Sequence, residues 1–167
     1  MKISFSPPYI EQDVIDEVVD TLKSGWITSG PKVKALEAEI CKLTGVSRSV
    51  CVNSWTSGAI LVLKWFGVKE GDEVILPAYT YSATALAVLQ SGATPIMVDI
   101  TGDFNIDANL IENAITAKTK VIIPVDIAGW PCDYDAINAI TYKDKIKCLF
   151  IPESEKQKAL GRILVVS

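Results

Sequence analysis

Hydrophobic residues recur at helical spacing in the first part of the chain. Over residues 10–24 they form one stripe with acidic residues opposite, a pattern that predicts an amphipathic helix. Residues 24–30 interrupt the stripe, and Pro31 stands where the first residue of a second helix is expected. Helical spacing then continues as far as Gly45. We therefore expect residues 1–45 to form an N-terminal helical segment.

From residue 46 onward, short apolar runs alternate with helical patterns. The apolar runs predict strands at residues 49–52, 73–76, 94–98, 121–125 and 163–166. Helices are expected at residues 58–66, 82–91, 106–115, 133–140 and 154–160. Strands that are apolar throughout and alternate with helices indicate a parallel sheet covered on both faces. The sequence thus predicts an α/β fold, a three-layer α/β/α arrangement with a mainly parallel sheet, over residues 46–167.

The composition is that of a globular protein, and it excludes several kinds of catalytic and binding site. Of the 167 residues, 49% are hydrophobic and 22% are charged, with a net charge of −4. The chain therefore lacks the basic surface that is typical of nucleic-acid-binding proteins. Histidine is absent, which excludes a Ser-His-Asp triad and a histidine-ligated zinc site built from this chain alone. The four cysteines form no Cys-x-x-Cys pair, so we expect buried reduced thiols and no metal site.

The sequence shows no signal for export or membrane insertion. Residues 1–8 lack the apolar core of a secretory signal, and the longest apolar run is far below the roughly 18 residues of a membrane span. We therefore expect a cytoplasmic protein that does not bind membranes.

One turn has the residues of an anion site. Asn53, Ser54, Trp55, Thr56 and Ser57 follow a predicted strand and open a predicted helix. Hydroxyl groups and free backbone N–H groups at a helix N-terminus suit a phosphate. The same residue types are also preferred as helix caps, and composition alone favours simple capping over an anion site. None of the ten glycines belongs to a dinucleotide-binding or P-loop motif, which disfavours those two kinds of nucleotide site.

Two further loops follow predicted strands. Residues 77–84 contain Tyr79 and Tyr81, which could stack on a flat ligand or pack in the core. Residues 124–131 form a turn rich in Gly and Pro, with Asp133 as the expected cap of the next helix. Because loops after parallel strands meet at the carboxyl edge of a sheet, all three loops should converge there.

Six segments, in order, resemble the DegT/DnrJ/StrS family over roughly residues 5 to 140. They are Ser24–Gly30, Asn53–Ala59, Gly71–Ile75, Pro77–Thr84, Gly92–Asp99 and Thr119–Val125. The members of this family are fold-type I pyridoxal-phosphate enzymes, mostly aminotransferases of keto sugars attached to nucleotides. The resemblance implies pyridoxal 5′-phosphate as the cofactor, a nucleotide-linked keto sugar and an amino donor as substrates, and a role in cell-surface polysaccharide or amino-sugar biosynthesis.

The resemblance also implies roles for particular residues. The family's phosphate loop falls on Ser54, Trp55 and Thr56, with Trp55 in place of the usual glycine. The aromatic residue that stacks on the cofactor ring falls on Tyr81. A loop near the substrate falls on Thr28, Ser29 and Gly30. The position of Asp126 is often histidine in relatives.

The resemblance places no catalytic residue within this chain. The lysine that binds the cofactor and the aspartate that pairs with its ring nitrogen are expected beyond Ser167, so residues 46–167 would be part of an incomplete large domain, and the small domain would be absent. The leading interpretation is an N-terminal portion of a sugar aminotransferase, with a homodimer or a companion chain as partner. Alternatives are a non-catalytic fragment or half of a split enzyme that acts through a partner chain, and an unrelated nucleotide-binding module. Dehydration instead of transamination also stays open.

Overall fold

The computed structural model describes residues 7–167 and divides the chain into two compact units. The first unit runs to Cys51, and the second comprises Val52–Ser167. Residues 1–6 of the predicted N-terminal segment lie outside the described residues.

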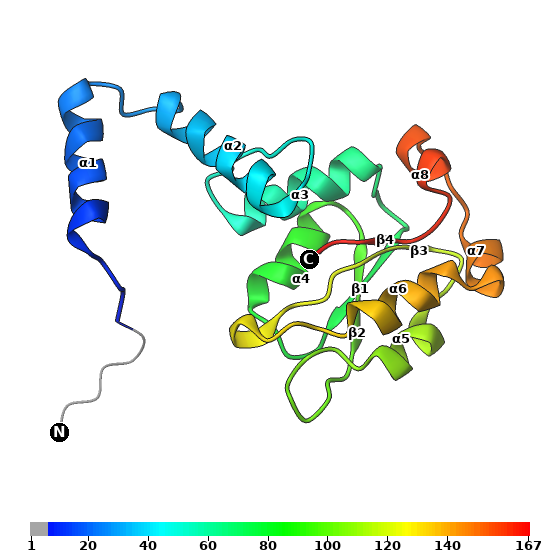
Figure 1. Ribbon diagram of the computed structural model, residues 1–167. Helices are drawn as coiled ribbons and strands as arrows, with labels where there is room; N and C mark the ends of the chain where they lie inside the picture. The colour runs from blue at the N-terminus through cyan, green and yellow to red at the C-terminus, as the bar shows by residue number, and fades with distance from the viewer. Residues whose placement is uncertain (1–6) are drawn as a thin grey trace. The chain divides into compact units, whose positions relative to one another are not determined.

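Two helices make up the first unit, as the hydrophobic stripes predicted. They are α1 (Gln12–Ser24) and α2 (Pro31–Thr44) (Figure 1). Each ends at a glycine with positive φ, Gly25 or Gly45, a conformation that glycine adopts readily because it has no Cβ. The Lys32 ammonium forms ion pairs with two acidic residues of α1 and so links the two helices. In the part of this unit that the structure describes, neither helix contains a fully buried residue.

A parallel sheet forms the centre of the second unit. Its strands are β1 (Glu73–Pro77), β2 (Thr94–Val98), β3 (Thr119–Ile122) and β4 (Leu164–Val165). Over residues 7–167 the order across the sheet is β2-β1-β3-β4, and every neighbouring pair is parallel. Ile75 of β1 lies opposite Ile96 of β2 and Ile122 of β3. The predicted parallel α/β fold is therefore confirmed.

The strand predicted at residues 49–52 is wrong. This segment pairs with no strand in the described part of the chain, and Val50 and Val52 are 75% and 46% exposed. The backbone N–H of Cys51 instead donates to the Glu37 carboxylate at 2.9 Å. Without a neighbouring strand the apolar side chains have no pleated surface to pack on, and their β propensity has no effect.

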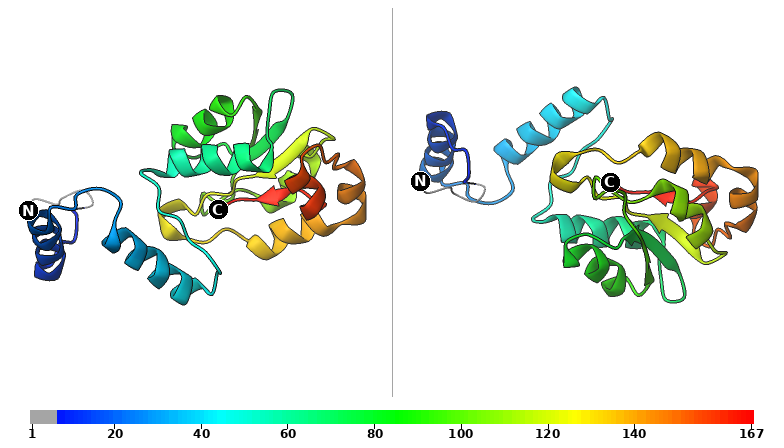
Figure 2. Two further views of the ribbon diagram at one scale, coloured as in Figure 1. Left: turned by 90° about the horizontal axis from the view of Figure 1, so that it is seen from above. Right: turned by 90° about the horizontal axis from the view of Figure 1, so that it is seen from below.

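Helices cover the sheet on both faces, in the predicted three layers. The helices α3 (Trp55–Phe66) and α4 (Ser82–Gln90) lie on one side and α6 (Tyr134–Tyr142) lies on the other (Figure 2). The helix α5 (Ala108–Ala114) packs beside α6, and α8 (Glu155–Leu160) contacts α3. A short helix that the sequence did not predict, α7 (Asp144–Leu149), follows α6.

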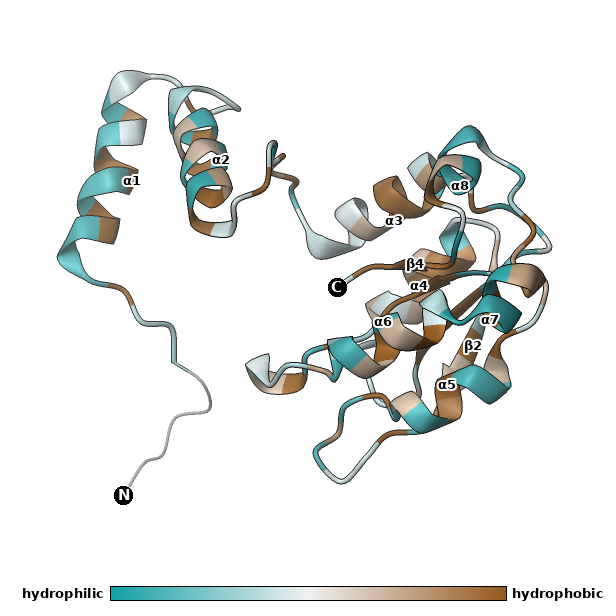
Figure 3. Cartoon of the chain, turned by 45° about the vertical axis from the view of Figure 1, so that its right-hand side comes forward, coloured by the Kyte–Doolittle hydropathy of each residue, from teal (hydrophilic) through white to brown (hydrophobic). Residues whose placement is uncertain are grey.

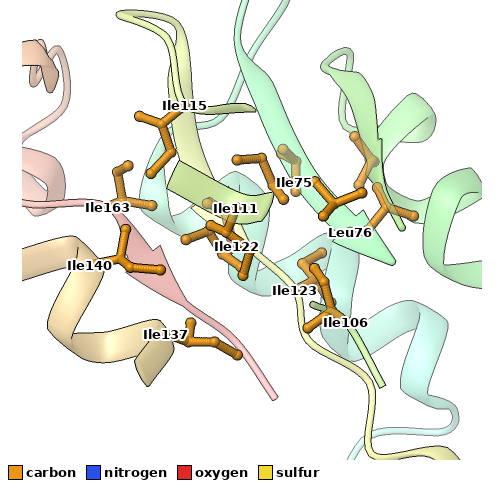
Figure 4. Packing of buried hydrophobic residues seen from close by; sticks show 14 of the residues in the cluster. Ile75, Leu76, Ile106, Ile111, Ile115, Ile122, Ile123, Ile137, Ile140 and Ile163 are labelled. Carbon is orange, nitrogen blue, oxygen red and sulfur yellow. The ribbon is translucent and has the colours of Figure 1, made fainter. Parts of the chain in front are cut away.

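Isoleucine dominates the core between the layers. Ile75 and Ile122 from the strands meet Ile137 and Ile140 of α6 in one cluster, and Ile75, Ile122 and Ile137 are fully buried (Figure 4). Figure 3 shows the same segregation, with β4 hydrophobic and α7 largely hydrophilic. In residues 7–167 every buried side-chain polar atom has a hydrogen-bond partner. Leu63 of α3 belongs to the same cluster, so the core extends over both faces of the sheet, as strands apolar throughout require.

A lysine is buried at the amino end of the sheet. Lys120 in β3 is 1% exposed, and its Nζ donates to the carbonyl oxygen of Ile151 at 2.6 Å. The same Nζ lies 3.8 Å from Oδ1 of Asp72, which is 4% exposed. Burial raises the pKa of the Asp72 carboxyl, although the Lys69 N–H and the Lys120 ammonium act to lower it. The Asp72 carboxylate and the Lys120 ammonium attract each other, and this attraction offsets part of the free-energy cost of removing both charges from water.

Contacts from α8 close the turn after α3. Gly67 ends α3 with φ +87°. The Ser154 hydroxyl donates to the Phe66 carbonyl oxygen at 2.7 Å, and Gln157 Nε2 donates to the Gly67 carbonyl oxygen at 3.3 Å. Segments nearly 90 positions apart in the sequence are joined in this way.

The expectation of buried cysteines is correct only for Cys132. Cys51 and Cys148 are exposed, Cys41 is partly exposed, and all four thiols are free within the described part of the chain. Between residues 7 and 167, no helix is both long enough and apolar enough to cross a membrane.

Candidate functional site

A cavity of about 500 Å³ lies at the carboxyl edge of the sheet. Its walls come from the start of α3, from the loop after β1 and from the segment after β3, with Ser167 after β4. These are the three loops expected to converge. The loops after β1 and β3 meet there because β1, β3 and β4 are parallel and end on the same side. The start of α3 follows no strand in the described part of the chain, and it reaches this edge because α3 packs against α4, the helix that follows β1.

The start of α3 presents unpaired donors. The Ser54 hydroxyl caps the helix by accepting from the Ser57 N–H at 3.1 Å, and the Gly58 N–H donates to the Ser54 carbonyl oxygen at 3.1 Å. Among the described residues, nothing accepts from the N–H groups of Trp55 and Thr56, and both residues line the cavity. Capping and anion binding are therefore compatible here, because capping occupies only Ser57. Two free N–H groups, the Thr56 hydroxyl and the positive end of the helix dipole together suit an anion.

An aromatic and hydroxyl wall comes from the loop after β1. Tyr81 lies directly before α4 and is 81% exposed. The hydroxyls of Thr80 and Thr84 are 2.9 Å apart and share a hydrogen bond, and both residues line the cavity. A tyrosine ring held before a helix offers a flat surface for another ring.

The segment after β3 contributes a carboxylate, Asp126, to the cavity lining. Oδ1 of Asp126 accepts from the Cys132 N–H at 2.9 Å and from the Tyr134 hydroxyl at 2.9 Å. Burial acts to raise the pKa of Asp126, but these donors outweigh it, and the pKa is lowered. Burial and the neighbouring Asp126 carboxylate raise the pKa of Tyr134 to about 12. At neutral pH the pair is thus a carboxylate with a neutral phenol as its donor.

The predicted site residues fall in two places. Trp55, Thr56 and Tyr81 line the cavity, whereas Ser54 caps α3 beside it. Thr28, Ser29 and Gly30 belong to the first unit, in the turn between α1 and α2.

The turn of the first unit has its own tight geometry. Trp26 Nε1 donates to the Ser29 carbonyl oxygen at 3.1 Å, and a Cβ on Gly30 would lie only 2.4 Å from that nitrogen. Glycine is therefore required at position 30 for the indole to approach the backbone.

The sequence did not single out Tyr134 as a site residue. The predicted cap at Asp133 is confirmed by its hydrogen bond from the Ala136 N–H at 2.9 Å, and that cap orients the first turn of α6, which includes Tyr134.

Residues 7–167 contain no cluster of three acidic or cysteine side chains that could hold a metal ion.

Comparison with known proteins gives consistent matches. The family model described as "DegT/DnrJ/EryC1/StrS aminotransferase family" matches residues 8–150. The spore coat polysaccharide biosynthesis protein SpsC of Bacillus subtilis (strain 168) is 42% identical, in an alignment that covers 96% of this chain and 43% of SpsC. The chain thus spans less than half the length of this relative.

Solved structures agree with the sequence matches. Spr1654 from Streptococcus pneumoniae, assigned as a sugar aminotransferase, was solved in a PMP form and a PLP form. Each form is 49% identical to this chain, with a TM-score of 0.93 over 100% of this chain and 42% of that one. The aminotransferase from Psychrobacter cryohalolentis is 32% identical, with a TM-score of 0.77 over 82% of this chain and 36% of that one.

Proposed function

Because this chain belongs to the DegT/DnrJ/EryC1/StrS aminotransferase family, we propose that it serves as part of a pyridoxal-phosphate-dependent aminotransferase. The reaction proposed is transfer of an amino group to a nucleotide-linked keto sugar in polysaccharide or amino-sugar biosynthesis. The observation that carries the proposal is the pair of free N–H groups at Trp55 and Thr56 among the described residues, in a cavity that also contains Tyr81.

The cavity suits the phosphate of this cofactor. Two backbone N–H groups and the Thr56 hydroxyl can donate to a phosphate dianion at a helix N-terminus. Trp55 in place of the usual glycine does not prevent this, because Trp55 has ordinary helical geometry and is not among the residues with positive φ. A glycine is therefore not needed for the backbone to turn here.

The remaining walls suit the ring and the substrate. Tyr81 offers the face on which a pyridine ring would stack. When bound, pyridoxal phosphate supplies the electron sink that amino-group transfer requires. The ionised Asp126 carboxylate, held by Cys132 and Tyr134, can accept a hydrogen bond from a sugar hydroxyl or from the ammonium group of an amino donor.

Other parts of the proposal rest on family resemblance. We assign Thr28, Ser29 and Gly30 to substrate binding, residues 46–167 to part of the large domain, and the activity to a cytoplasmic homodimer or a complex with a companion chain. The lysine and the aspartate that complete the reaction are assigned to a part of the enzyme outside this chain. The polysaccharide role of SpsC supports a sugar substrate.

The test is cofactor binding by the full-length enzyme. Purified protein with added pyridoxal phosphate should show the absorbance band of a lysine-bound cofactor. Thr56→Val should weaken the cofactor affinity by about 1–3 kcal/mol, the usual effect of losing a hydrogen bond to a charged group. Thr44→Val, the same change at an exposed residue at the end of α2, should leave that affinity unaltered.

Two outcomes would count against the proposal. Equal cofactor affinity in Thr56→Val and the unmodified enzyme would contradict the phosphate site. Absence of both the band and amino transfer would contradict the enzyme assignment and would favour the non-catalytic alternative.

A further inference from the structure

Asn105 uses both ends of its side-chain amide to hold a distant turn. It lies in the loop between β2 and α5 and is 3% exposed. Its Nδ2 donates to the Trp130 carbonyl oxygen at 2.9 Å, and its Oδ1 accepts from the Ile127 N–H at 3.2 Å. A buried amide with both groups paired to backbone fixes those backbone atoms, because leaving either group unpaired out of water is costly.

The turn that Asn105 holds is strained. The 3₁₀ turn η1 (Ile127–Gly129) contains Ala128 with φ 52° and ψ 26°, followed by Gly129 with φ 79°. A left-handed conformation is unfavourable for alanine and persists only where the surroundings impose it. The two bonds from Asn105 fall on either side of Ala128, so they supply this constraint.

Asn105 is itself anchored from its own loop. Its backbone N–H donates to Oδ1 of Asp103 at 3.2 Å, and its carbonyl oxygen accepts from the Thr101 N–H at 2.9 Å. The constraint on the turn therefore comes from a fixed part of the fold.

Asp126 stands at the start of this turn and lines the cavity. The Gly129 N–H donates to the Asp126 carbonyl oxygen at 3.1 Å, so the backbone of Asp126 is part of the same turn. We propose that Asn105 is a positioning residue, which fixes the turn at residues 126–130 and through it the Asp126, Ile127 and Ala128 wall of the cavity. Its consequence for cofactor binding rests on the proposed function.

The contact itself is tested by hydrogen–deuterium exchange of the full-length protein, read by mass spectrometry. In Asn105→Ala, residues 126–132 should exchange about tenfold faster, the change expected when one or two hydrogen bonds are lost. This segment includes the Cys132 N–H, whose hydrogen bond is to Asp126 and not to Asn105. Residues 134–142 should exchange within twofold of the unmodified protein, which separates loss of positioning from general destabilisation.

The matched control is Asn109→Ala. Asn109 is exposed, and among the described residues its side chain bonds only to Asp107 in its own turn. This variant should leave both segments unchanged. Asn105→Asp is the second variant, in case Asn105→Ala does not fold. It keeps the acceptor for Ile127 but places an oxygen against the Trp130 carbonyl, so exchange should quicken in the same segment.

The functional readout is the affinity of each variant for pyridoxal phosphate, measured by equilibrium dialysis. The urea midpoint of each variant is measured as well, so that a loss of affinity can be told apart from a loss of stability. We expect Kd to rise about tenfold in Asn105→Ala and to stay within twofold in Asn109→Ala. Faster exchange with an unchanged Kd would show a merely structural role and overturn the proposal, as would unchanged exchange. If the unmodified protein binds no pyridoxal phosphate, the proposed function fails, and the exchange comparison still decides whether Asn105 holds the cavity wall.

Discussion

Gly67→Ala should destabilise the full-length protein by about 1.5–3.5 kcal/mol. Part of this destabilisation comes from backbone strain. Gly67 has φ +87°, and a left-handed conformation costs a residue with Cβ roughly 1–2 kcal/mol. The rest is a clash, because a new Cβ would lie 2.5 Å from Ser154 Cβ and 2.8 Å from its Oγ. Relief of the clash displaces Ser154 and breaks its hydrogen bond to Phe66, for about 0.5–1.5 kcal/mol more.

Gly71→Ala isolates the clash. Gly71 has φ +90°, nearly that of Gly67, but no atom of the described residues beyond its chain neighbours lies within 4 Å of where its Cβ would stand, so only the backbone cost of about 1–2 kcal/mol should appear. The assay is the urea midpoint and slope of both variants. Equal destabilisation in the two variants would refute the argument. Ser154→Gly, which removes the clashing Cβ, should reduce the additional effect of Gly67→Ala.

Three further predictions concern stability and reactivity. Lys120→Ala should destabilise by about 3–5 kcal/mol in urea unfolding because it leaves the buried Asp72 carboxylate without the ammonium group beside it. Lys118→Ala, at an exposed position, should change stability by less than about 0.5 kcal/mol. Burial and the Asp126 carboxylate raise the pKa of the Cys132 thiol to about 11. Alkylation of Cys132 by iodoacetamide should therefore be slow at pH 8 and should accelerate as the pH rises toward 11, because the thiolate is the reactive form. Fast labelling of Cys132 at pH 8 would contradict this. Asp133→Ala should cost about 1 kcal/mol in the urea midpoint because α6 loses its cap, and an unchanged midpoint would show that the cap contributes nothing.

Features set by local sequence were predictable. The cap at Asp133, the start of α2 at Pro31 and all four observed strands each follow from neighbouring residues. The segment 49–52 has the same local character as those strands, but whether it pairs depends on neighbours elsewhere in the sheet. Local patterns do not contain that information.

Features that depend on distant partners could not be predicted from the sequence. The lysine-rich stretch after α6 has the composition of a solvated segment, yet it forms α7 and buries Ile146. Lys120 is buried because Asp72 and the Ile151 carbonyl, both distant in sequence, come to meet it.

The candidate site divides in the same way. Trp55, Thr56 and Tyr81 stand beside recognisable motifs, and the structure places them at one cavity, while their binding roles stay predictions. Tyr134 and Asn105 carry no such signal, because only the tertiary fold brings them to the turn that begins at Asp126.

The strand order β2-β1-β3-β4 has a consequence for folding during synthesis. The first of these strands to be made, β1, becomes interior, and each later strand joins an edge that is still free when it emerges from the ribosome. About 24 residues separate the ends of β2 and β3, which corresponds to roughly one to a few seconds of translation. Elementary pairing steps take on the order of microseconds, so β2 has time to dock before β3 appears. Among the four described strands, none must be inserted between two that have already paired, and the sheet can grow outward in the order in which it is translated.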